Sequence, residues 1–322
     1  MIESRLRALA VQWLGQPQRA VIIEVRQARG STPRQAGTRM LVRENAVFGT
    51  IGGGHLEWQA IRFAREALQE AELATKGSRG ADDILPAQRE MALGPSLGQC
   101  CGGHVTLQWR WLDESALREW IEPEAMFHLQ LYGAGHVGCE VARLLARLEC
   151  RVDWIDEREE AFPAAGDEVW RDAPHIRRVV TDGIAAEVAE APPGAHLLIM
   201  THSHALDLDI VTQALKRPDT GFVGLIGSAT KRARFTRQLL ERQIPEQALT
   251  KLICPIGLPG LQGKEPAVIA ISVVAQLLQT SAGTTSQDGF ERTKMSLGAP
   301  ETAAELDQFG AVWQAANNSA EI

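Results

Sequence analysis

The sequence predicts an α/β protein: an N-terminal α+β domain followed by a C-terminal Rossmann-like domain with a doubly wound parallel sheet. In the second half of the chain, short apolar runs alternate with helical patterns, which is typical of a buried parallel sheet covered by helices on both faces. In the first half, β-branched runs are separated by turn residues. The 322 residues also exceed the size at which one core usually keeps growing, so two domains are expected.

The first domain is expected to span residues 1–112. Its first strand is β-branched around Val21–Val25 and is ended by a loop that contains Pro33 and Gly37. In chain order, the patterns predict a helix over 4–16, strands over 20–26, 39–42 and 46–48, a helix over 55–74, and strands over 87–93 and 105–112.

A charged segment, residues 113–125, is expected to link the two domains, and it contains Pro123. The Rossmann-like domain is expected over 126–280. The tail, 281–322, is rich in Ala, Thr, Ser and Gln and is expected to be partly disordered. Within the second domain, we expect strands over 127–132, 151–155, 178–180, 196–200 and 222–226, and helices over 137–148, 207–215, 231–243 and 266–279.

The composition excludes several classes of protein. The formal net charge is −7, and a nucleic-acid binder needs a basic face to neutralise phosphates. No apolar run approaches the roughly 18 residues of a membrane span, and Met1–Arg5 lacks the core of a signal peptide. The five cysteines have irregular spacing, which does not fit a secreted disulfide framework. We therefore expect a cytoplasmic protein with neither a nucleic acid nor a membrane as partner.

Two adjacent thiols, Cys100 and Cys101, lie in a glycine-rich loop. Neighbouring Cα atoms are about 3.8 Å apart, which is below the usual disulfide range of roughly 4.4–6.8 Å. The two thiols are therefore expected to be free, and thiolates prefer soft partners such as transition metals or sulfur species. The alternative is that they are buried as small apolar groups.

A dinucleotide-binding turn is predicted at Gly133, Gly135 and Gly138, because these glycines follow an apolar strand and open a helix. Asp156 follows the next predicted strand, where a carboxylate could accept a ribose hydroxyl. The turn is thus a candidate nucleotide site. Alternatively, the glycines serve only the packing of the helix on the sheet.

Two further loops of the second domain carry polar residues at predicted strand ends. His202 and His204 follow an apolar strand, at the edge where open α/β sheets bind ligands. They could share a metal ion, or one could bind a ligand while Asp207 caps the next helix. Ser228 precedes a helix that begins with basic residues, Lys231 among them, which resembles an anion site. The alternative is that these basic residues are simply solvated.

In the first domain, Gly52, Gly53 and Gly54 precede a helix and form another candidate phosphate cradle. Arg34 and Arg39 are its expected charge partners, and His55 and Glu57 would face the ligand. The alternative is a tight turn whose glycines serve geometry alone.

Taken together and in this order, these motifs resemble the XdhC/CoxI family of accessory proteins for molybdenum hydroxylases. The matching segments are distributed over residues 20–280; they are 30–37, 49–57, 98–103, 133–138, 201–207 and 224–228. The resemblance implies a chaperone that binds the molybdenum cofactor (molybdopterin), a phosphorylated pterin whose dithiolene holds the metal. It also implies a homodimer, with apo xanthine dehydrogenase and a cysteine desulfurase as partners. Many relatives carry Cys where this chain has His55. The resemblance therefore implies that the thiols of Cys100 and Cys101 are the groups that would contact the molybdenum.

Three functions are therefore compared. The first is a cofactor-insertion chaperone that is not itself an enzyme. The second is an NAD(P)-dependent oxidoreductase that uses the Gly133–Gly138 turn and Asp156, although the sequence contains no persuasive hydride-transfer pair. The third is a metal-dependent hydrolase built on His202, His204 and Asp207.

Overall fold

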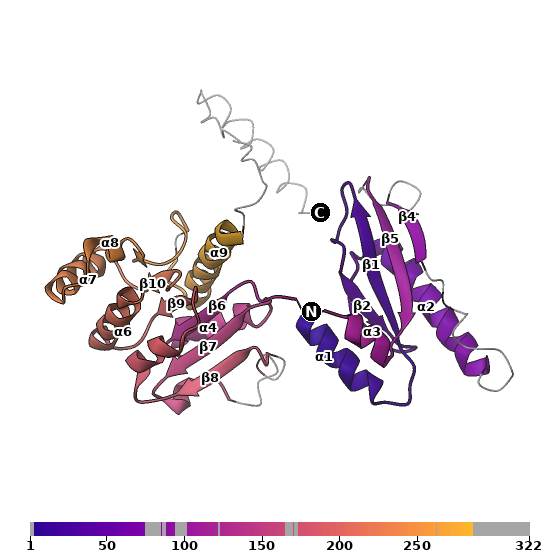
Figure 1. Ribbon diagram of the computed structural model, residues 1–322, viewed down its shortest axis with the longest axis horizontal. Helices are drawn as coiled ribbons and strands as arrows, with labels where there is room; N and C mark the ends of the chain where they lie inside the picture. Colours follow the sequence, from indigo (N-terminus) through magenta and orange to yellow (C-terminus); the bar gives the residue numbers. More distant parts are fainter. Residues whose placement is uncertain are drawn as a thin grey trace, which may run out of the picture. The chain divides into compact units, whose positions relative to one another are not determined.

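The computed structural model describes residues 3–74, 85, 88–93, 102–121, 123–164, 170, 173–261 and 263–285. These residues form two β-sheets, one in each half of the chain (Figure 1). The N-terminal α+β region and the Rossmann-like region with a parallel sheet are therefore as the sequence predicts. Of the helices described, none is long and apolar enough to cross a membrane.

The N-terminal sheet has five antiparallel strands in the order β3-β2-β1-β5-β4. The strands are β1 (Val21–Arg29), β2 (Arg39–Val42), β3 (Val47–Gly49), β4 (Gln88–Ala92) and β5 (His104–Trp111). The helices of this region are α1 (Glu3–Leu14), α2 (Gly54–Ala74) and α3 (Glu114–Glu119). Alternate strand residues face opposite sides, and the consecutive residues Val21, Ile22 and Ile23 are all buried, so both faces of this sheet are covered at β1.

Different helices cover these two faces. Val21, Ile23 and Val25 pack with the apolar side of α2. Ile22 points the other way and packs with α1 and α3. The predicted linker therefore contains a helix, α3, that is part of the N-terminal core, with Trp120 just beyond it also buried there.

The second sheet has six parallel strands in the order β11-β10-β9-β6-β7-β8. The strands are β6 (His128–Tyr132), β7 (Arg151–Asp156), β8 (Ile176–Val180), β9 (His196–Ile199), β10 (Val223–Leu225) and β11 (Leu252–Ile253). The helices are α4 (His136–Leu145), α6 (His204–Lys216), α7 (Ala229–Glu241), α8 (Glu246–Leu249) and α9 (Pro266–Thr285), with 3₁₀ helices at Glu159–Ala161 and Ile184–Glu190.

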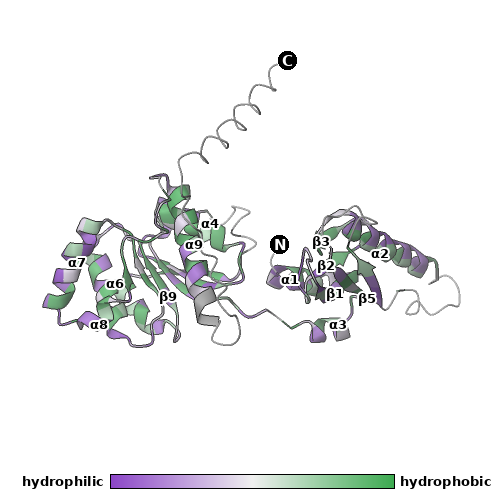
Figure 2. Cartoon of the chain, turned by 90° about the horizontal axis from the view of Figure 1, so that it is seen from above, coloured by the Kyte–Doolittle hydropathy of each residue, from purple (hydrophilic) through white to green (hydrophobic). Residues whose placement is uncertain are grey.

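Helices cover both faces of this sheet, which makes it doubly wound. Leu198 packs on the side of α4 and α9, whereas Leu197 and Ile199 pack on the side of α6 and α7. In Figure 2 the hydrophobic colour follows β9, while α6 and α7 show both colours. Strands that are buried on both faces leave polar side chains little space except at the strand ends.

The sequence predicted the helices and strands better than their ends. Helix α6 begins at His204 and α7 at Ala229, both earlier than expected, because Ser203 and Ser228 cap them: each serine oxygen accepts a hydrogen bond from a backbone N–H of its helix. Helix α9 continues to Thr285, past the expected end at residue 279. The remainder of the expected tail lies outside the described residues.

Candidate functional site

The glycine turn after β6 has the predicted strand–turn–helix geometry. Gly133 has φ +112°, and a Cβ there would lie 2.4 Å from the oxygen of Met200. A Cβ on Gly138 would lie 2.1 Å from the oxygen of Gly133. These two glycines are therefore required by packing. Gly135, in contrast, caps α4 with no atom within 4 Å of its Cβ position, so its backbone is open to a ligand.

The sequence predicts a carboxylate at Asp156 that is free to bind a ribose, but in the structure this carboxylate is already engaged. It is 1% exposed, and its Oδ2 accepts the N–H of Ala134 at 2.7 Å. Arg158 donates to the same carboxylate from its backbone N, Nε and Nη2, at 2.9–3.0 Å. Although burial opposes its charge, these hydrogen bonds and the guanidinium hold the pKa of Asp156 below its ordinary value. The carboxylate thus stabilises the turn itself.

A cavity of about 400 Å³ lies at the ends of β9 and β10, and predicted site residues that follow both strands line it. Its lining includes His202 from the loop after β9, His204 from the first turn of α6, and Ser228 from the loop after β10. All three side chains are at least partly exposed. The structure therefore brings the histidines and the serine together.

A buried ion pair joins these two loops. Lys231 Nζ donates to Asp207 Oδ2 at 2.7 Å and to the oxygen of Ile226 at 2.9 Å. Asp207 Oδ1 accepts the hydroxyl and the backbone N–H of Thr201. Asp207 is therefore not the helix cap that we considered, and Lys231 is not a solvated surface charge. An ammonium has three donors, so one N–H of Lys231 remains for an acceptor in the cavity it lines.

Three helices begin at the same edge of the sheet. The cavity beside α4, of about 430 Å³, shares Thr201 and His202 with the cavity between β9 and β10. Helices α4, α6 and α7 follow β6, β9 and β10, which are neighbours in the sheet. Each helix N-terminus carries a partial positive charge and unpaired N–H groups. This edge can thus attract an anionic group such as a phosphate.

A metal site at His202 and His204 finds no support in the geometry. Among the residues that the structure describes, no group of three or more His, Cys, Asp or Glu could hold a metal ion. His202 Nε2 instead lies 3.4 Å from the carboxylate of Glu157. The metal-dependent hydrolase therefore lacks a described ligand set.

In the N-terminal region, three loops with predicted residues meet at one end of the sheet. A Cβ on Gly103 would lie 2.5 Å from the oxygen of Ser31, so these two loops are in backbone contact. Gly52 lies against the ring of Pro33: a Cβ on Gly52 would lie 2.4 Å from the Pro33 Cγ atom and 3.8 Å from the Arg34 Cγ atom. The segment 30–34 therefore touches both of the other loops.

The glycine cradle is partly filled by the chain's own carboxylate. Glu57 Oε2 accepts the backbone N–H groups of Ile51 and Gly53, each at 3.0 Å, and the hydroxyl of Thr50. The sequence predicts that Glu57 faces a ligand, but its carboxylate instead binds the turn. Arg39 was expected to be a charge partner for a phosphate at this turn, but its guanidinium pairs with Glu24 and Glu3.

His55 is held in position on the first turn of α2. Its ring stacks on Trp58, with centroids 5.3 Å apart, and the Gln59 amide nitrogen lies 2.8 Å from its Nε2. His55 and Trp58 are both exposed, and Arg62 lies over the Trp58 ring. The sequence identified His55 but not the side chains that orient it, although their spacing on a helix could have indicated them.

The cysteines divide into two groups. Cys100 and Cys101 lie outside the described residues, although Leu93 and Gly103, on either side of their segment, are joined by a backbone hydrogen bond of 2.7 Å. Cys139, Cys150 and Cys254 are free thiols. Burial raises the pKa of each of these three, to about 12 for Cys150, so they remain protonated at neutral pH.

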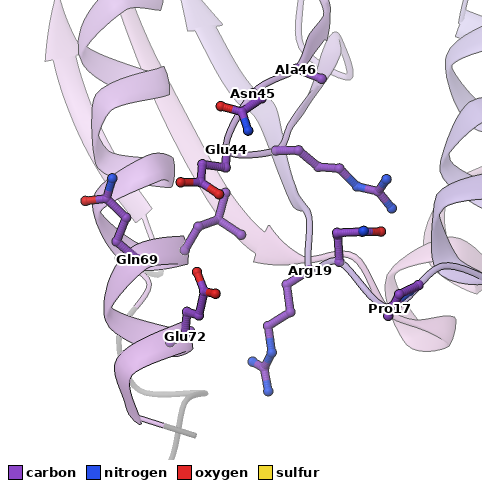
Figure 3. A pocket seen from close by; sticks show the side chains of 11 residues that line it. Pro17, Arg19, Glu44, Asn45, Ala46, Gln69 and Glu72 are labelled. Atoms are coloured by element: carbon purple, nitrogen blue, oxygen red, sulfur yellow. The ribbon is translucent and has the colours of Figure 1, made fainter. Parts of the chain in front are cut away.

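One cavity contains none of the predicted residues. It has about 470 Å³ and lies between the end of α2, the turn between β2 and β3, and the loop after α1. In Figure 3, Glu72 extends from α2 toward the side of the cavity where Arg19 lies. No motif of the sequence indicated this cavity, because its residues come from three surface segments without a shared pattern.

Comparison with known protein families gives two matches. Residues 129–277 match the XdhC Rossmann domain, and residues 13–76 match the XdhC and CoxI family. Together the two matches cover more than half of the chain. They include the carboxyl edge of the parallel sheet and the Gly52–Gly54 turn.

Two individual proteins are similar to this chain at low sequence identity. The Escherichia coli K12 protein YqeB, described as uncharacterized, is 28% identical over 252 residues, which are 78% of this chain and 42% of YqeB. The chain thus spans less than half the length of this relative. A Bacillus halodurans protein described as a xanthine dehydrogenase has a solved structure with a TM-score of 0.66 at 20% identity, covering 90% of this chain and 98% of that one. This likeness shows a shared fold.

Substitution of Gly52 is expected to disturb the N-terminal loops more than substitution of Gly53. Both have positive φ, which costs alanine about 1–2 kcal/mol. Only Gly52 also meets the Pro33 ring, and such overpacking adds about 1–3 kcal/mol. Urea unfolding of Gly52→Ala and Gly53→Ala measures the difference. Equal losses of stability would mean that the contact with Pro33 is unimportant.

Asp156→Asn is expected to lower the free energy of unfolding by about 2 kcal/mol at pH 7, because hydrogen bonds to a charged carboxylate are lost. The folded pKa of Asp156 is lowered, so its stabilisation is present above the ordinary aspartate pKa of about 3.9 and is lost as the pH falls through the lower folded value. Unfolding curves at several pH values measure this. A difference between the two proteins that stays constant down to pH 2 would contradict it.

Proposed function

Because the chain belongs to the XdhC and CoxI family, we propose that it is an accessory protein of a molybdenum hydroxylase. In this role it binds the molybdenum cofactor, protects it, supports its sulfuration by a cysteine desulfurase and inserts it into apo xanthine dehydrogenase. The chain then acts as a chaperone and not as an enzyme, and the cofactor is its cargo.

The observation that carries this proposal is the meeting of three loops at one end of the N-terminal sheet. The segment 30–34 contacts Gly52 on one side and Gly103 on the other. The thiols Cys100 and Cys101 lie directly before Gly102 and Gly103 in the sequence. The proposal therefore assigns the molybdenum end of the cargo to these thiols, with Arg34 and His55 on the neighbouring loops.

The carboxyl edge of the parallel sheet suits the phosphate of the cargo. Lys231, with one N–H donor left, lines the cavity at the ends of β9 and β10. This cavity, of about 400 Å³, has the size of a small-molecule site. Phosphate groups are favoured at helix N-termini by unpaired N–H groups and by the helix dipole.

The alternative, an NAD(P)-dependent oxidoreductase, loses one of the two features on which it rested, the free carboxylate of Asp156. Asp156 already accepts four hydrogen bonds from the chain itself. The buried pair of Asp207 and Lys231 is likewise engaged in holding two loops together. The geometry therefore favours the accessory role.

Loss of either thiol is expected to reduce cofactor binding. The full chain is incubated with molybdenum cofactor released from a molybdoenzyme and then desalted, and bound molybdenum is measured by mass spectrometry. Cys100→Ala and Cys101→Ala should each retain about tenfold less metal, as is typical when a metal site loses a supporting group. Cys150→Ala is the control, because Cys150 is 3% exposed in the core. Full retention by both loop variants would remove the thiols from the proposal.

Delivery is tested with apo xanthine dehydrogenase. The loaded chain should restore activity faster and to a higher level than the same amount of free cofactor, because the bound cofactor is protected from oxidation. The chain with both Cys100→Ala and Cys101→Ala should give no advantage over free cofactor. If the wild-type chain also gives none, the insertion role is wrong.

A further inference from the structure

The cavity beside the glycine turn contains an arginine that the proposed function does not use. Arg158 follows β7 and lines this cavity together with Gly135, His136 and Cys139. Its side chain is 36% exposed, whereas that of its partner Asp156 is 2% exposed. The pair therefore presents its guanidinium, and not its carboxylate, to the cavity.

The carboxylate of Asp156 has no acceptor position left. An ionised carboxylate offers about four lone-pair positions. Ala134 fills one, and Arg158 fills three through its backbone N, Nε and Nη2. In glycine-turn domains that bind NAD, the acidic residue at this place accepts the ribose 2′-hydroxyl. Here that hydroxyl would have to displace an internal hydrogen bond.

Arg158 still has donors to offer. A guanidinium has five N–H donors, and the hydrogen bonds to Asp156 use two of them, one on Nε and one on Nη2. Arginine at this place in a Rossmann domain accommodates a 2′-phosphate on the ribose. The hydrogen-bonded carboxylate of Asp156 raises the pKa of Arg158, and the nearby charges of Glu160 and Glu157 add to this effect. These carboxylates oppose the binding of an anion. The expected preference is therefore modest.

We propose that this cavity binds a nucleotide whose ribose carries a phosphomonoester, with that phosphate on Arg158, and that it discriminates against the unmodified ribose diol. The backbone at Gly135 and the N-terminus of α4 receive the 5′-phosphate. This site does not require the molybdenum role. Nucleotide binding and molybdenum retention are measured separately, so each can fail without the other.

A matched pair of ligands tests the proposal. Adenosine 2′,5′-bisphosphate and adenosine 5′-monophosphate differ only in the 2′-phosphate, and calorimetric titration of the full chain at low salt gives both affinities. We expect the bisphosphate to bind about tenfold more tightly, since a hydrogen bond to a charged group contributes about that factor. Arg158→Gln should abolish the difference.

Arg177→Gln is the control variant. Arg177 also pairs with an aspartate of β7, Nε to Asp153 Oδ1 at 2.7 Å, but it is not part of this cavity's lining. It should keep the preference for the bisphosphate. The proposal is overturned if the wild-type chain binds the two ligands equally, if it binds neither at millimolar concentration, or if Arg177→Gln loses the preference as fully as Arg158→Gln does.

Discussion

The parallel arrangement of the second sheet determines where this protein can hold a ligand. All paired strands run in the same direction, so every strand ends, and every following helix begins, at the same edge. Because both faces of the sheet are buried under helices, the polar side chains within the strands, such as Gln130 and Asp153, pair with other groups of the chain, and the open polar sites lie at the strand ends. The turn at Gly135, the loop with His202 and His204, and the loop with Ser228 are far apart in the chain and meet for this reason.

The same edge attracts carboxylates from the chain itself. Asp156 binds the N–H of Ala134, and Asp207 binds the N–H of Thr201. In the other sheet, Glu57 does the same for the Gly52–Gly54 turn. Unpaired N–H groups in a tight turn favour a negative charge, and an internal carboxylate supplies it without the entropy cost of binding a ligand. Each turn is thereby rigid, and the donors that remain are those available to a ligand.

This explains which parts of the protein the sequence could predict. The two sheets and most helices follow from apolar periodicity, which reports burial directly. The glycine turns follow from residue type and from their position between strand and helix. The hydrogen-bond partner of a carboxylate cannot be predicted in this way, because an acidic residue that binds a ribose and one that binds its own turn occupy the same place in the sequence. Asp156, Asp207 and Glu57 could be assigned only from distances of about 3 Å between named atoms.

The segment that contains Cys100 and Cys101 is bounded on both sides by described residues of the N-terminal region. The hydrogen bond from the Leu93 N–H to the Gly103 oxygen closes the segment that contains Cys100 and Cys101. Gly103 in turn lies so close to Ser31 that no side chain could be accommodated there. Both ends of the thiol segment are thus tied to the sheet, beside the segment that contains Arg34. Because burial raises the pKa of the three cysteines that the structure describes, the proposal assigns the metal-binding thiolates to this segment and not to them.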